Sequence, residues 1–137
     1  MKKSNFHLKL ITRDRILLDG EYAFAVIPAG GGPLGVLPGH TSLMGTIAGG
    51  LLKLRDENKK EISVFVDRGF FMIAQDDITV TTAVAETDAA IDVDRAGEAR
   101  DRARQRLNSK DASIDMYRAR AALNRSEARL KVAQHMI

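Results

Sequence analysis

Arginines at helical spacing are the side chains of this sequence best suited to bind a ligand. Arg95 and Arg102 lie seven residues apart, and Arg125 and Arg129 lie four residues apart near the C-terminus. On a helix, each spacing places both side chains on one face. Guanidinium groups bind phosphate through charge and through paired hydrogen bonds. The pattern therefore allows an anion site, although charge pattern alone favours solvated surface arginines.

Carboxylates accompany these arginines in the expected arrangement. Antiparallel packing of two helices brings the end of the second near the start of the first, so we expect Arg95, Arg125 and Arg129 to converge. Asp92 and Glu86 then lie nearby. Asp92 suits the amino group of adenine or the hydroxyls of ribose, and it equally suits the N-cap of a helix. The cluster is a candidate nucleotide site, with helix capping as the alternative.

No catalytic or metal-binding motif is recognisable in the sequence. There is no Cys, which excludes disulfides, thiol catalysis and cysteine-ligated metals. His7, His40 and His135 stand alone, without the spacing of metal ligands, and His40 better suits a hydrogen bond beside a tight turn. We predict no catalytic residue, no metal site and no required cofactor, so a binding or regulatory role is favoured.

The segment from Gly30 to Gly35 fits the dinucleotide fingerprint G-x-G-x-x-G. That motif needs a helix directly after it, because the helix N-terminus holds the pyrophosphate. Pro33 lies within the segment and Pro38 follows closely, so no helix can run through it. We interpret the segment as a turn-rich loop.

Short strands are expected to make up the first part of the chain. Phe6, Leu8 and Leu10 alternate with more polar residues, which indicates a half-buried strand. Many short strands with frequent turn signals predict an antiparallel β-sandwich or flattened barrel over residues 1–86. The predicted strand segments are residues 6–11, 22–29, 51–55, 62–66, 70–74 and 78–84.

Helical periodicity replaces this pattern after Val84, and no Gly follows Gly97. A first helix, capped by Asp92 or Asp94, is followed by a break at residues 108–111. A second helix is expected to begin at Asp111 or Ser113. Residues 87–137 are thus predicted to form an antiparallel two-helix hairpin. The expected buried stripes are Ala96, Ala99, Ala103 and Leu107 on the first helix, and Ile114, Tyr117, Ala121 or Ala122, Leu123, Leu130 and Ala133 on the second.

The predicted seam between the helices is rich in alanine, which buries little apolar area. Such helices form readily but dock weakly, so a detachable hairpin and a fixed one are about equally favoured. Residues 89–137 carry 11 basic and seven acidic side chains, whereas residues 1–88 are nearly neutral. The basic tail indicates an anionic partner.

Two kinds of partner are disfavoured by the sequence. Acidic residues interrupt the basic tail, and Tyr117 is its one aromatic residue, so a nucleic-acid surface that stacks bases is not expected. No apolar run approaches the roughly 20 residues of a membrane span. We expect a soluble protein, or one attached to a membrane through a partner without direct insertion.

Several motifs resemble those of one family, the epsilon subunits of bacterial F-type ATP synthases. The segment Leu34-Gly35-Val36-Leu37-Pro38-Gly39-His40, followed by Thr41-Ser42-Leu43, resembles their signature loop. Ile91-Asp92-Val93-Asp94-Arg95-Ala96 matches their [IL]-D-x-x-R-A element. Residues 66–71, 78–80, 118–123 and 129–133 are similar in the same order and spacing, so the resemblance covers essentially the whole chain.

This resemblance implies a non-catalytic rotor subunit at the cytoplasmic face of the bacterial plasma membrane. The sandwich would bind the gamma subunit and the c-ring, and so help to couple proton or sodium flow to rotation. Pro33 departs from the family, because many members carry Glu at that position. The residues implied for the contact with gamma and the c-ring are Leu34, Gly35, Pro38, Gly39 and His40.

The resemblance also implies a regulatory helical domain that extends towards the alpha and beta subunits and inhibits ATP hydrolysis. Some members bind ATP, alone or with Mg²⁺, in the folded hairpin. The implied ATP-binding residues are Ile91, Asp92, Arg95, Ala96, Glu86, Arg102, Arg125 and Arg129. The implied contacts with an acidic segment of the beta subunit are Arg118, Arg120, Arg125 and Arg129. The alternative is a purely structural coupler without switching or ATP sensing.

Overall fold

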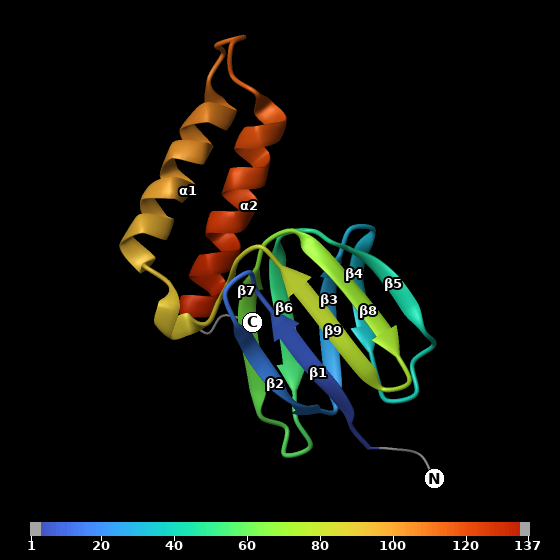
Figure 1. Ribbon diagram of the computed structural model, residues 1–137. Coiled ribbons are helices and arrows are strands. Elements are labelled where there is room, and N and C mark those ends of the chain that lie inside the picture. The colour runs from blue at the N-terminus through green and yellow to red at the C-terminus, as the bar shows by residue number, and fades with distance from the viewer. Residues whose placement is uncertain (1–3, 135–137) are drawn as a thin grey trace.

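The computed structural model describes residues 4–134, which form a β-sandwich followed by a helical hairpin (Figure 1). The hairpin stands beside one end of the sandwich, and the C-terminal end of α2 approaches β7. The strands are β1 (Phe6–Ile11), β2 (Ile16–Tyr22), β3 (Phe24–Ala29), β4 (Gly32–Val36), β5 (Leu43–Ile47), β6 (Gly50–Arg55), β7 (Glu61–Val66), β8 (Gly69–Ala74), β9 (Asp77–Thr82) and β10 (Ala85–Glu86). The helices are the 3-10 turn η1 (Asp88–Ala90), α1 (Val93–Asn108) and α2 (Met116–Ala133).

The strands pair in the order β10-β7-β6-β3-β5-β8-β9-β1-β2, and β4 pairs with β3. The predicted sandwich is therefore confirmed, and its pairings are antiparallel with one exception among the described strands. β1 and β9 pair in parallel, from His7 opposite Asp77 to Ile11 opposite Thr81. A parallel neighbour needs a long connection, and most of the sandwich lies between these two strands in the chain.

Alternating side chains fill the centre of the sandwich. Phe6, Leu8 and Leu10 of β1 are at most 1% exposed, whereas His7 and Lys9 between them are half-buried. Burial on one face fixes the register, since a slip of one residue would exchange the two faces. The core residues are Phe6, Leu8, Leu10, Tyr22, Ala25, Ile27, Val36, Ile47, Leu52, Leu54, Val64, Val66, Phe71, Ile73, Ile78 and Val80.

Two predicted hairpins are confirmed, and their turns carry residues in the left-handed region. Gln75 and Asp76 have φ values of 51° and 64° between β8 and β9. Lys59 has φ 64° between β6 and β7. Two successive residues with positive φ match the right-handed twist of the flanking strands, so the chain reverses tightly there.

The sequence prediction misses four strands, β2, β4, β5 and β10. The run expected at residues 22–29 corresponds to β3, and only its first residue, Tyr22, belongs to β2. β5 carries no clear alternation. The expected turn-rich loop is also partly wrong, because Gly32–Val36 forms β4 and pairs with β3. Pro33 is tolerated because it lies opposite Pro28 at the outer end of that pairing, and the rejection of a helix there is confirmed.

Aspartates begin both helices. Asp92 caps α1, as expected, by accepting a hydrogen bond from the Arg95 amide at 3.1 Å. The cap of α2 is Asp115, and the prediction of Asp111 or Ser113 is wrong. Asp111 instead accepts hydrogen bonds from the Ser113 amide and hydroxyl, which hold the pKa of its carboxyl below the usual value.

The hairpin seam is built from small side chains. Ala96 and Ala103 of α1 are buried, and Ala99 and Leu107 are half-buried, so the predicted stripe is confirmed. On α2 the prediction fails at Tyr117, which is 88% exposed. The buried residues of α2 are Ala119, Leu123, Ser126, Ala128, Leu130 and Val132.

The stripe prediction for α2 fails because this helix packs on two sides. It contacts α1, and it also contacts β6 and β7 of the sandwich. Ala128 and Val132 share a cluster with Phe65 of β7 and with Ile91. A helix buried on two sides has a broader apolar pattern than a single stripe. This small cluster is the apolar link between the hairpin and the sandwich.

Candidate functional site

A cavity of about 340 Å³ opens where the start of α1 meets the end of α2. Six of the eight predicted nucleotide residues line it, so the expected gathering of these side chains is largely observed. Its volume falls in the range of small-molecule sites. We call it the hairpin pocket. Its lining residues are Glu86, Ala90, Asp92, Arg95, Ala96, Ala99, Arg102 and Arg129.

Arg129 forms the wall of the hairpin pocket nearest the sandwich. Its Nε donates a hydrogen bond to Glu86 Oε1 at 3.0 Å. Its guanidinium also lies 4.2 Å from the centroid of the Phe65 ring. The side chains of Arg129 and Glu86 are 28% and 23% exposed, so solvent screens this pair only partly. These two contacts hold α2 to β7 and β10.

The opposite wall of the hairpin pocket, formed by α1, carries more positive charge than the wall formed by Arg129 and Glu86. Arg95 and Arg102 project from α1, and within residues 4–134 neither side chain forms an ion pair or a hydrogen bond. The Asp92 carboxylate is engaged by the Arg95 amide at the start of the helix. The wall thus offers two unpaired guanidinium groups, which suits an anionic ligand.

Two predicted residues lie outside the pocket lining. Ile91 is 8% exposed and packs with Phe65, so it supports the pocket from beneath. The expected convergence of Arg125 with Arg95 and Arg129 is wrong. Arg125 lies one turn before Arg129, about 6 Å along the helix axis, and at that level α2 faces the loops of the sandwich.

Those loops and α2 enclose a second cavity of about 690 Å³, which we call the loop–helix cleft. Of the arginines predicted to contact a beta subunit, Arg118 and Arg125 line it. Arg129 faces Glu86, and Arg120 is exposed away from both cavities. In this compact form, three of the four arginines therefore face their own chain.

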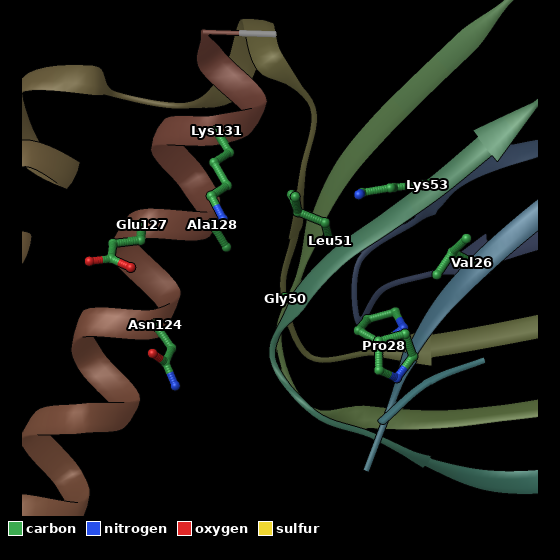
Figure 2. Close-up of a pocket in the computed structure, with 10 residues that line it drawn as sticks. Val26, Pro28, Gly50, Leu51, Lys53, Asn124, Glu127, Ala128 and Lys131 are labelled. Carbon is green, nitrogen blue, oxygen red and sulfur yellow. The ribbon is translucent and has the colours of Figure 1, made fainter. Parts of the chain in front are cut away.

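A groove of about 370 Å³ separates part of α2 from β3, β4 and β6. Figure 2 shows Leu51 lying opposite Ala128, and Lys53 and Lys131 also line the groove. Val26 and Pro28 provide apolar surface on the strand side. Because this groove is open, the contact between helix and sandwich is incomplete and rests on few side chains.

The predicted rotor-contact loop lies on the sandwich. Leu34 and Gly35 belong to β4, opposite Ile27 and Val26 of β3. Gly39 has φ +83°, which favours glycine, and its amide donates to Asp76 Oδ1 at 2.6 Å.

His40 is half-buried beside the turn at Pro38 and Gly39, and its Nδ1 lies 2.7 Å from the Thr41 carbonyl oxygen. The hydrogen-bonding role expected for His40 is thus observed. These contacts connect the loop to the β8–β9 turn and fix its shape, which leaves Leu37 58% exposed at its tip.

The structure shows an exposed apolar face on β5 and β8 that was not predicted from the sequence. Met44, Phe70 and Met72 are 75%, 66% and 45% exposed, and Met44 lies opposite Met72. A signal is present in the sequence, because residues 70–73 are apolar at every position and therefore on both faces of the strand. Exposed apolar side chains gathered in this way mark an interaction surface.

Residues 4–134 contain no group of three or more His, Asp or Glu side chains placed to hold a metal ion. His135 lies outside the described residues. No helix between residues 4 and 134 is long and apolar enough to cross a membrane.

Comparisons with known proteins match both halves of the chain. The family model for the beta-sandwich domain of the ATP synthase Delta/Epsilon chain matches residues 5–88. The model for the long alpha-helix domain of the same chain matches residues 90–134.

Curated relatives are similar over nearly their full length. The ATP synthase epsilon chain of Moorella thermoacetica is 37% identical over 95% of this chain and 97% of its own. That of Brevibacillus brevis is 36% identical over 96% and 99%. A chain in the Euglena gracilis mitochondrial ATP synthase, solved with OSCP, F1 and the c-ring, has a TM-score of 0.81 and 25% identity. That match covers 98% of this chain and 84% of the other.

Proposed function

The chain belongs to the ATP synthase epsilon chain family, and we propose that its two halves divide rotor attachment from regulation. The β-sandwich attaches to the rotor of a bacterial F-type ATP synthase. The helical hairpin senses ATP and inhibits ATP hydrolysis when it extends. The main support for this division is the contact between the two halves. The hairpin packs on the well-packed sandwich through the small cluster around Phe65 and Val132, directly beside an arginine-lined pocket.

The rotor partners are the gamma subunit and the c-ring, and the exposed surface of the sandwich supports this assignment. Met44, Phe70 and Met72 offer an apolar face of the kind that a partner subunit covers. The loop that contains Pro38 and Gly39 is a second contact. Through these contacts the chain helps to couple proton or sodium flow to rotation at the cytoplasmic face of the plasma membrane, without catalysing a reaction itself.

The hairpin pocket takes ATP, alone or with Mg²⁺, as a regulatory ligand. Arg95 and Arg102 bind the phosphates, because their guanidinium groups have no partner in the described chain. Arg129 and Glu86 form the wall nearest the sandwich, and Asp92 is available to adenine or ribose. A ligand that binds both helices stabilises the compact form, because it is lost when the hairpin opens.

Inhibition requires the hairpin to leave the sandwich and reach the alpha and beta subunits. The same arginines then exchange partners. Arg118, Arg125 and Arg129 face their own chain in the compact form, and with Arg120 they contact an acidic segment of a beta subunit in the extended form. Compact and extended forms therefore compete for the same positive charges.

Calorimetric titration of the 137-residue chain with ATP and Mg²⁺ tests the ligand. We expect saturable binding that weakens on the order of tenfold in Arg95→Ala, since one charge-assisted hydrogen bond is worth about 1.5–3 kcal/mol. Arg106→Ala is the matched control, because Arg106 is also an exposed α1 arginine but lies outside the pocket. No heat, or equal binding by Arg95→Ala and the unaltered chain, would remove ATP from the proposal.

A purely structural coupler is the second candidate, and the contacts of Arg129 with Glu86 and Phe65 favour it, because they hold α2 to the sandwich in addition to the apolar cluster. A chain that ends after Asp88 separates the two candidates in the assembled synthase. Regulation predicts that this chain still binds gamma while ATP hydrolysis rises. A structural coupler predicts the same binding and an unchanged rate of hydrolysis.

A further inference from the structure

The loop–helix cleft is lined from both halves of the molecule and is separate from the hairpin pocket. Its sandwich side consists of Ala48 and Gly49 between β5 and β6, with Asp67 and Arg68 between β7 and β8. Its helix side is the first half of α2, which contributes Arg118 and Arg125 among others. At about 690 Å³, it is roughly twice the volume of the hairpin pocket.

Positive charge is in excess in this cleft. Arg68 comes from the sandwich, while Arg118 and Arg125 lie seven residues apart on α2, two turns along one face. In the described part of the chain, none of these three side chains forms an ion pair or a hydrogen bond. Guanidinium groups of two separate elements therefore face a shared space without a counter-charge bound to them.

The two carboxylates of the cleft are already engaged by backbone amides. Asp67 Oδ1 accepts a hydrogen bond from the Arg68 amide at 2.9 Å. Asp115 Oδ1 accepts one from the Arg118 amide at 3.1 Å, as the N-cap of α2. Each carboxylate keeps its negative charge, so the three arginines exceed the acidic groups of the lining by one positive charge.

Gly49 allows the helix to approach the sandwich at this point. A Cβ atom at this position would lie 3.6 Å from Arg125 Cγ and 3.4 Å from Asp67 Oδ1, so the stem of Arg125 lies directly over the glycine. Arg125 is correspondingly half-buried. The close approach places the stem of Arg125 at the junction between α2 and the sandwich loops, where this residue lines the cleft.

We propose that the loop–helix cleft binds a free multivalent phosphate anion, which bridges Arg68 of the sandwich to Arg118 and Arg125 of α2. Guanidinium groups suit phosphate by charge and by paired donors, and a shared anion converts repulsion between like charges into attraction. Because the anion contacts both halves, it stabilises the docked hairpin. The site does not depend on nucleotide binding in the hairpin pocket.

The test uses inorganic pyrophosphate as the probe, titrated calorimetrically into the full 137-residue chain at constant ionic strength. We expect saturable binding that weakens on the order of tenfold in Arg68→Gln, since a charge-assisted hydrogen bond is lost. Arg13→Gln is the matched control, because it removes an exposed arginine of the sandwich that lies outside the described cavities. Its affinity is expected to equal that of the unaltered chain.

Three results would overturn the proposal. One is equal affinity in Arg68→Gln and the unaltered chain, and another is an equal loss in Arg13→Gln, which would indicate diffuse attraction. The third is loss of pyrophosphate binding in Arg102→Gln, because that would place the anion in the hairpin pocket. Failure of the nucleotide proposal leaves these outcomes unchanged, since ATP is absent from the titration.

Two further measurements test whether the anion stabilises docking of α2 and whether its source is free phosphate or a nucleotide. Hydrogen exchange of the α2 amides is expected to slow when pyrophosphate is added to the unaltered chain, and exchange that is unchanged would remove the bridging role. Competition between ATP and pyrophosphate for the cleft, measured in the Arg102→Gln chain, distinguishes free phosphate from the triphosphate of a nucleotide. Free phosphate is the ligand if ATP fails to displace pyrophosphate, whereas displacement would contradict that choice and assign the cleft to a nucleotide's triphosphate.

Discussion

The β-sandwich and the helical hairpin bury their side chains in different ways. The sandwich has one continuous core that includes Phe6, Leu8 and Leu10, each at most 1% exposed. The hairpin has a seam of small residues and meets the sandwich through a cluster around Phe65 and Val132. Because stabilisation scales with the apolar area buried, the first half is held far more firmly than the second is docked. One chain thus combines a well-packed sandwich with a hairpin that is docked through few side chains.

The largest effect is expected from a cavity in the sandwich core. Leu8→Ala should lower the free energy of unfolding by about 2–5 kcal/mol, because Leu8 is fully buried and its site cannot collapse. Urea unfolding of the chain measures this loss. Leu37→Ala, at a position that is 58% exposed, is the control and should change stability by less than about 0.5 kcal/mol. Similar losses in both variants would contradict the contrast between core and surface.

A smaller and more local effect is expected at the docking cluster. Val132→Ala removes two buried methyl groups and should weaken docking of α2 by about 1–2 kcal/mol. Faster hydrogen exchange in α2, with unchanged exchange in β1, would show that the halves open independently. If β1 and α2 lost protection together, the two halves would be one cooperative unit and the comparison would break down.

The N-cap of α2 provides a prediction of about 1 kcal/mol. Asp115→Ala should destabilise α2 by that amount, because the Asp115 carboxylate accepts the Arg118 amide. Asp111→Ala is the matched control, since Asp111 holds a turn before the helix. Loss of helical circular dichroism on heating measures both. A larger effect from Asp111→Ala would restore the cap expected from the sequence.

The smallest effect concerns pH at the edge of the sandwich. Hydrogen bonding to Glu21, and then to Asp19, raises the pKa of His7 above 6.5. Because the folded-state pKa is the higher one, this contribution to stability is complete below about pH 6.5 and is lost as pH rises through the folded pKa. An NMR titration of His7 should give a midpoint above 6.5 in the unaltered chain and a lower one in Glu21→Gln. Equal midpoints would refute the assigned cause.

The sequence predicted the sandwich well where alternation was regular, as in β1, and where two apolar runs flank a polar turn, as in β6 and β7. It failed at β4, because a strand made from Gly32, Pro33 and Gly35 has the composition of a loop. It failed on α2, where Ala128 and Val132 are buried outside the predicted stripe, because this helix packs on two sides. Composition and local spacing do not report which further element covers a helix or an edge strand.

For the candidate site, the sequence likewise predicted some residues correctly and misplaced or missed others. Arg95, Arg102 and Asp92 follow from their spacing along one helix and from a recognisable motif. Arg125 was misplaced because a difference of one helical turn between it and Arg129 decides which cavity each side chain faces. The exposed face around Met44 was missed because burial by a partner and burial in a core give the same apolar pattern.

In the proposed mechanism, the hairpin must leave the sandwich in order to inhibit ATP hydrolysis. Since the chain has no Cys, Leu51→Cys with Ala128→Cys gives one thiol pair across the contact seen in Figure 2. The decisive measurement is ATP hydrolysis by the assembled synthase with this pair oxidised and then reduced, under conditions that favour inhibition. We predict faster hydrolysis in the oxidised, locked form and restored inhibition on reduction. Equal rates in the two states, with the crosslink verified, would contradict the account.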